Sequence, residues 1–120
     1  MTKHNMRQGD VILVEADVSP ESLVEVKAEP VLAYGEVTGH AHRLHGSCAL
    51  MADGPMTADE VAAFARTGAK KPKLYVVARN DSVALRHEEH APLILKQGKV
   101  YEVRRQREWS DANEPIAVAD

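Results

Sequence analysis

The sequence contains a single cysteine, Cys48, which excludes an internal disulfide and any zinc site built from several cysteines. It also has no apolar run approaching the roughly 18 residues that cross a membrane. Residues 1–7 lack the apolar stretch of a secretory signal. We therefore expect a cytoplasmic protein without a membrane partner.

An excess of charge of either sign is lacking as well, because the formal net charge is only −3. The tail formed by residues 110–120 carries Asp111, Glu114 and Asp120 with no lysine or arginine, and these three acids account for all of it. The remainder of the chain is therefore formally neutral, which gives no overall attraction to nucleic acid but leaves room for a local basic face.

Short apolar runs separated by turn residues predict a mainly-β fold. The expected strands lie at 11–14, 23–27, 31–44, 48–51, 74–78, 82–87, 93–95 and 100–103, and the run 31–44 forms either one strand or two with a bend. With 120 residues, 44% of them hydrophobic, the chain is the size of one domain. We expect a single small barrel or sandwich of about seven strands over residues 1–109. Residues 110–120 are expected to form an acidic, mobile tail.

One short helix is predicted between residues 57 and 68. Thr57 and Glu60 have the spacing of a capping box, in which each side chain bonds the backbone N–H of the other residue. Gly68 is placed to end the helix, and Phe64 lies on its apolar side.

Five of the six histidines lie in two short segments, which suggests a site. Strand alternation places His40 and His42 on one face and sends His45 to the opposite face. The second segment begins at the end of an alternating strand, so His87 is expected at the edge of the core with His90 in the loop that follows.

These segments predict a metal site with an open coordination position. The predicted ligands are His40, His42, His87 and His90. Neutral imidazole binds divalent transition metals, here zinc, iron, nickel or manganese. Glu36 and Glu88, with Glu89 as a further candidate, are the expected catalytic bases. The predicted function is a metal-dependent hydrolase acting on a small or phosphate-containing substrate.

Other interpretations remain open for the same residues. The histidines could act without metal as an acid–base pair in a phosphodiesterase or nuclease, or they could form a structural network. Arg104 and Arg105 are candidate substrate contacts, although alternation separates them and a solvated, salt-bridged edge strand is the simpler explanation. With Arg107 they could instead serve a non-catalytic module that binds nucleic acid or protein. Pairing of exposed edge strands would give a homodimer.

Two resemblances accompany these patterns. Gly35 followed by His40 and His42 resembles the first motif of the cupin superfamily, which implies a small β-barrel enzyme with a metal on its inner face. The later glutamate of that motif is absent, and Pro92 follows the second histidine cluster instead of preceding it. The Gly-His-Ala-His and His-Glu-Glu-His motifs together also resemble a group of small bacterial and phage proteins of uncharacterised function. This resemblance spans most of residues 7–109 and implies that both clusters belong to one unit.

Overall fold

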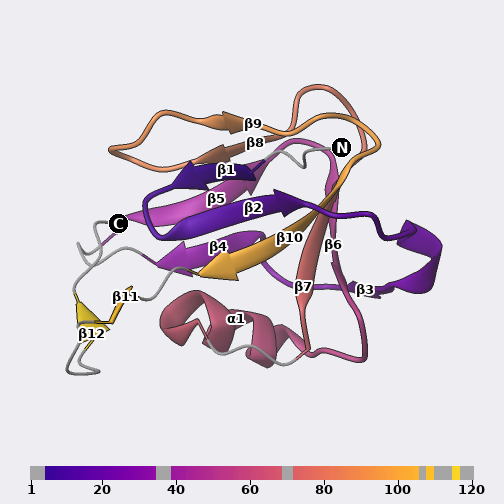
Figure 1. Cartoon of the computed structure of the whole chain (residues 1–120), viewed down its shortest axis with the longest axis horizontal. Helices are drawn as coiled ribbons and strands as arrows, with labels where there is room; N and C mark the ends of the chain where they lie inside the picture. The colour runs from indigo at the N-terminus through magenta and orange to yellow at the C-terminus, as the bar shows by residue number, and fades with distance from the viewer. Residues whose placement is uncertain (1–4, 35–38, 69–71, 106–107, 110–114, 117–120) are drawn as a thin grey trace.

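The computed structural model describes residues 5–34, 39–68, 72–105, 108–109 and 115–116 (Figure 1). The strands are β1 (Asn5–Gln8), β2 (Val11–Glu15), β3 (Val24–Val26), β4 (Val31–Tyr34), β5 (Ala41–His45), β6 (Cys48–Ala52), β7 (Leu74–Ala78), β8 (Ala84–Arg86), β9 (Leu93–Ile94), β10 (Val100–Arg105), β11 (Glu108–Trp109) and β12 (Pro115–Ile116). One α-helix, α1 (Ala58–Thr67), and a 3-10 turn at Pro20–Ser22 complete the described elements.

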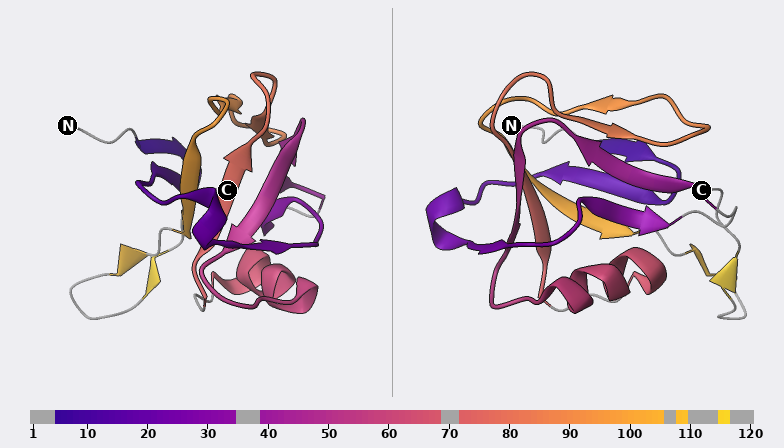
Figure 2. Two further views of the ribbon diagram at one scale, coloured as in Figure 1. Left: turned by 90° about the vertical axis from the view of Figure 1, so that its right-hand side faces the viewer. Right: turned by 180° about the vertical axis from the view of Figure 1, so that it is seen from behind.

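Two antiparallel sheets face each other as separate layers (Figure 2). The larger sheet has the order β1-β2-β10-β7-β6-β3, and the smaller has the order β4-β5-β8-β9. The predicted mainly-β class with one short helix is confirmed. These sheets hold ten strands and are not closed into a barrel, so the fold is an open sandwich. The run 31–44 forms two strands, β4 and β5, which are antiparallel partners.

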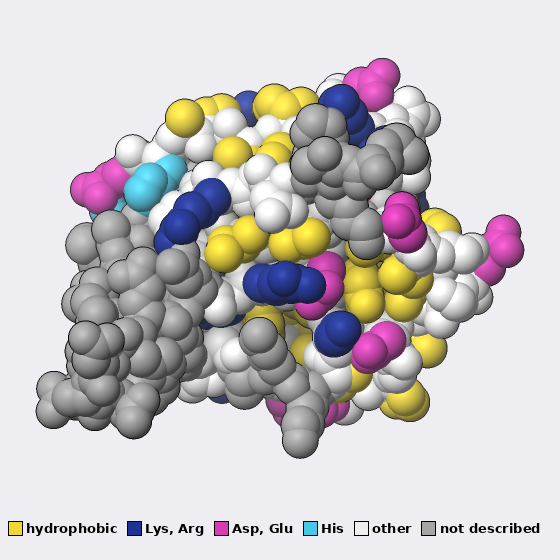
Figure 3. Space-filling model, viewed as in Figure 1, with side chains coloured by type: hydrophobic (Ala, Val, Ile, Leu, Met, Phe, Trp, Pro, Cys, Tyr) yellow, Lys and Arg dark blue, Asp and Glu magenta, His cyan; other side chains and the backbone are white. Residues whose placement is uncertain are grey.

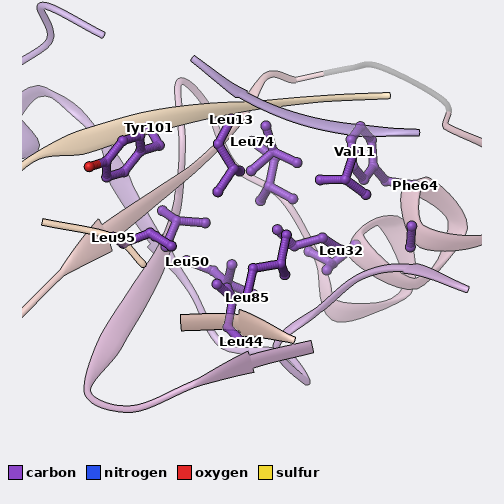
Figure 4. Close-up of a cluster of buried hydrophobic side chains, with 14 of the residues drawn as sticks. Val11, Leu13, Leu32, Leu44, Leu50, Phe64, Leu74, Leu85, Leu95 and Tyr101 are labelled. Atoms are coloured by element: carbon purple, nitrogen blue, oxygen red, sulfur yellow. The ribbon is translucent and has the colours of Figure 1, made fainter. Parts of the chain in front are cut away.

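The core fills the space between the two sheets (Figure 4). Leu13 and Leu74 contribute from the larger sheet, and Leu32, Leu44 and Leu85 contribute from the smaller one. Each of these side chains is at most 4% exposed, so each contributes about 1.5–3 kcal/mol through removal of apolar surface from water. This shared core fixes how the two sheets lie against each other.

Helix α1 closes one end of the sandwich and packs against β4. Its capping box is confirmed, because Thr57 Oγ1 accepts the Glu60 N–H and Glu60 Oε1 accepts the Thr57 N–H. Gly68 ends the helix in the left-handed region at φ 75°. Within the described part of the chain, no helix is long and apolar enough to cross a membrane.

The turn between β5 and β6 requires glycine at position 46. Gly46 has φ 104°, and an added Cβ would lie 2.8 Å from Ser82 O and 3.0 Å from Val83 Cα. Because both atoms belong to backbone, Gly46→Ala should lower the free energy of unfolding by about 2 kcal/mol in urea denaturation. Gly98→Ala is the matched control, since Gly98 also has positive φ but no described atom lies within 4 Å of its added Cβ. Equal losses in the two variants would show that the contact with residues 82–83 is unimportant.

Candidate metal centre

Pairing of β5 with β8 brings the two histidine segments together. The register sets Arg43 opposite Arg86 and Leu44 opposite Leu85. Just beyond the last of these pairs His42 lies beside His87, and their ring centroids are 4.4 Å apart. His42 is fully buried and His87 is 8% exposed, whereas His45 faces solvent as alternation predicts.

The rings of all four predicted histidine ligands form one cluster. The His87 ring centroid lies 4.4 Å from that of His42, 4.7 Å from that of His90 and 5.4 Å from that of His40. The His42 and His90 rings are nearly parallel, with centroids 5.9 Å apart. His87 is therefore the central ring of the cluster.

Gln8, at the end of β1 in the opposite sheet, fixes the orientation of His42. Its Nε2 donates to Leu85 O and Ala91 O, both at 2.9 Å, so its Oε1 is left to accept a hydrogen bond. That oxygen lies 2.8 Å from His42 Nδ1, which must therefore carry the hydrogen. In the neutral ring the lone pair is then on Nε2, which is buried and makes no hydrogen bond to the described residues.

The surroundings of His42 keep its ring neutral. Burial, with a smaller contribution from the neighbouring His87 and His90, lowers the pKa of His42 to about 4, although Asp10 acts in the opposite direction. A neutral imidazole with a defined tautomer is the form that binds a metal ion.

Asp10 lies near Nε2 of His42, the ring nitrogen that makes no hydrogen bond to the described residues. It sits in the two-residue turn between β1 and β2, and its Oδ1 is 3.8 Å from His42 Nε2. Arg105 holds the other oxygen, with Nε donating to Asp10 Oδ2 at 2.8 Å. The same guanidinium donates through one nitrogen to Phe64 O and Ala65 O in the last turn of α1, at 2.9 Å each.

Glu88 lies beside His40 and His87. Its Oε1 accepts the backbone N–H of Ala41 at 2.9 Å, and this hydrogen bond lowers the pKa of the Glu88 carboxyl. One ligand atom from each of His40, His87 and Glu88 lies within 4.8 Å of the others. Ligands of one zinc ion lie up to about 4 Å apart, so small side-chain rotations would bring these three onto one ion. Figure 3 shows histidine side chains reaching the surface at one edge of the face in view.

His87 has a different hydrogen-bonding arrangement from His42. Its Nδ1 accepts the backbone N–H of Glu89 at 3.0 Å, which places the hydrogen of a neutral His87 ring on Nε2. Metal binding through either nitrogen requires this hydrogen bond to open. His42 is therefore ready to bind as it stands, whereas His87 must rearrange.

The other predicted site residues are separated. Glu36 lies outside the described residues, as does Arg107. Arg104 points away from the cluster and makes bidentate hydrogen bonds to Glu102, while Arg105 points inward to Asp10. Cys48 is partly buried against the core, and burial raises the pKa of its thiol, which does not favour a metal-binding thiolate.

Sequence reasoning missed two residues of this cluster, Gln8 and Asp10. Both lie on the β1–β2 hairpin, in the sheet opposite the histidines. The available signal was weak: Gln8 is a polar residue inside a strand, and Asp10 follows a glycine in a tight turn.

Fold and site together define a small mainly-β protein with a histidine and carboxylate cluster at one edge of a two-sheet sandwich. Residues 7–106 match the family described as a domain of unknown function (DUF8820), and the chain belongs to this family. No curated protein and no solved structure matches the chain. The family description names no activity, and the resemblance to cupins stays a prediction.

Proposed function

We propose that the protein is a metal-dependent hydrolase whose divalent transition metal is held by His40, His87 and Glu88, with His42 and His90 alongside. The observation that carries this proposal is the convergence of those three side chains, whose ligand atoms lie within 4.8 Å of one another. Two nitrogens and one oxygen leave an open position for water or substrate, as catalytic zinc sites do.

Glu88 is better suited to hold the ion than to accept a proton. The hydrogen bond from Ala41 lowers its pKa, which keeps the carboxylate ionised and makes it a weaker base. A bound divalent ion supplies an activated water at neutral pH. We assign a phosphate ester as substrate class: an oxygen of water bonds to phosphorus, the ester P–O bond breaks, and the proton lost by water ends on the leaving alcohol.

Metal-free acid–base catalysis is the weaker candidate. A histidine acts best as a proton carrier when its pKa is near the working pH. Burial lowers the pKa of His42 to about 4, so this ring is poorly matched to proton transfer at pH 7. The same neutral ring is well matched to a metal ion.

Metal analysis tests the proposal directly. We expect the wild-type protein dialysed against zinc or manganese to retain bound metal, and the His40→Ala/His87→Ala variant to lose the ion held by His40, His87 and Glu88. For that position, zinc at about 100 times its dissociation constant should raise the free energy of unfolding by about 2.7 kcal/mol in the wild type, and this contribution should be absent in the variant. Hydrolysis of bis(4-nitrophenyl) phosphate should fall to the background rate in the same variant.

His45→Ala is the matched control, because His45 is on the same strand as His42 but faces solvent. It should retain both the metal and the zinc-dependent stabilisation. The proposal is wrong if the wild type retains no more metal than the double variant. If the wild type retains metal but does not hydrolyse the phosphodiester, the metal site is supported and the proposed reaction is wrong.

A further inference from the structure

The side of His42 that faces Asp10 presents an unusual pairing of two bases. His42 Nε2 carries a lone pair because Gln8 holds the ring hydrogen on Nδ1. Asp10 Oδ1 faces this nitrogen at 3.8 Å. A hydrogen bond between nitrogen and oxygen is about 2.7–3.2 Å long, so no shared proton spans this gap.

Neither group is free to turn away from the other. Gln8 is fixed by Leu85 O and Ala91 O, which locks the ring tautomer. Asp10 is fixed through its other oxygen by Arg105, which is itself anchored on Phe64 O and Ala65 O. Two electron-pair donors held against each other in a partly buried place are stabilised by a cation between them.

The spacing suits such a cation. Zinc bonds nitrogen and oxygen at about 2.0–2.2 Å, so two of its ligands can be separated by up to about 4 Å. His90 lies beside this position, because its ring stacks on that of His42 with centroids 5.9 Å apart, and its Nε2 is buried without a hydrogen bond within the described part of the chain. The full burial of His42 means that water competes poorly for this nitrogen.

We infer that His42 and Asp10, with the His90 ring beside them, form a second divalent metal position next to the one held by His40, His87 and Glu88. This inference rests on the proposed metal-binding function and deepens it. The rings of His42 and His87, one from each position, have centroids 4.4 Å apart. In hydrolases with two metal ions the ions are about 3.5–4 Å apart and bind both the attacking and the leaving oxygen of a phosphate ester. A second position is therefore consistent with the phosphate-ester substrate proposed above, because two ions can bind both of these oxygens.

Metal stoichiometry tests the second position. Titration of the full chain with Co²⁺, followed by its visible absorption, and equilibrium dialysis against Zn²⁺ should both give two equivalents for the wild type. Asp10→Asn should bind one equivalent, because the amide keeps the shape but loses the anionic ligand. Glu88→Gln should also bind one, at the His42 position, with a cobalt spectrum different from that of Asp10→Asn.

Asp81→Asn is the control, since Asp81 is an exposed loop residue away from the cluster, and it should bind two equivalents. If Asp10→Asn does not fold, His42→Asn takes its place, because asparagine can still donate to Gln8 and one equivalent is again expected. One equivalent in the wild type, lost in Glu88→Gln, would overturn the second position and leave the first intact. No bound metal in the wild type would overturn both, and two equivalents in Asp10→Asn or in the folded His42→Asn would place the second ion elsewhere.

Discussion

Replacing Arg105 by methionine should lower the free energy of unfolding by about 3 kcal/mol in urea denaturation. The side chains of Arg105 and Asp10 are only 10% and 15% exposed, so the variant leaves an anion without its counter-charge in a largely dry place. Phe64 O and Ala65 O at the end of α1 lose a charged donor at the same time. Removing one partner of a buried pair typically costs about 3–5 kcal/mol. Because the Arg105 and Asp10 side chains are still partly exposed, we expect a loss at the low end of this range.

Arg104→Met is the matched control from the next position of β10. Arg104 also makes bidentate hydrogen bonds to a carboxylate, in this case Glu102, but the Arg104 side chain is 48% exposed. Water already solvates this pair, so its loss should cost less than about 1 kcal/mol. Similar losses in both variants would mean that the inward arginine has no special role.

The double variant Asp10→Asn/Arg105→Met separates charge from packing. It leaves no unpaired charge, so it should recover a large part of the stability lost in Arg105→Met. It should also bind no metal at the His42 position, because the anionic ligand is gone. A double variant as unstable as Arg105→Met would assign the loss to the helix carbonyls rather than to Asp10.

Local sequence patterns were sufficient to predict the helix and to predict on which side of a strand individual residues lie. Thr57, Glu60 and Gly68 act within one turn of the helix ends, so their roles follow from spacing alone. Alternation likewise sends His45 outward and separates Arg104 from Arg105. These contacts depend on residues a few positions apart, which is the range over which backbone geometry repeats.

The assembly of the site depends on strand pairing that no local pattern encodes. β5 pairs with β8, although β6, α1 and β7 lie between them in the sequence. The register of that pairing decides that His42 meets His87, and a shift by one residue would turn one ring to the other face. The two clusters could therefore be recognised in the sequence, but their contact could not be derived from it.

Gln8 and Asp10 were missed for a related reason. They reach the histidines from the opposite sheet, and their partners are distant in sequence: Leu85 for Gln8 and Arg105 for Asp10. Burial gives these residues their importance, and burial follows from the packing of the two sheets. A polar residue in a short edge strand looks like ordinary solvated surface before that packing is known.

The free energy of unfolding of the metal-free protein should fall by about 3 kcal/mol between pH 6.5 and pH 4. Burial lowers the pKa of His42 from 6.5 to about 4 in the folded protein, so in this window the unfolded chain binds a proton that the folded chain does not. Acid therefore favours unfolding, and the full contribution of the neutral ring is present only above about pH 6.5. Urea denaturation at half-unit steps of pH measures how the free energy of unfolding depends on pH.

His42→Asn should flatten this profile, because asparagine keeps a donor for Gln8 but does not titrate. His45→Asn, the same substitution on the solvent-facing side of β5, should keep the wild-type profile. Saturating zinc should raise stability at pH 7 and make the fall toward pH 4 steeper, because protons and zinc compete for the same lone pair on Nε2. A wild-type profile that zinc raises equally at every pH would mean that the metal does not bind His42, and the second position would have to be abandoned.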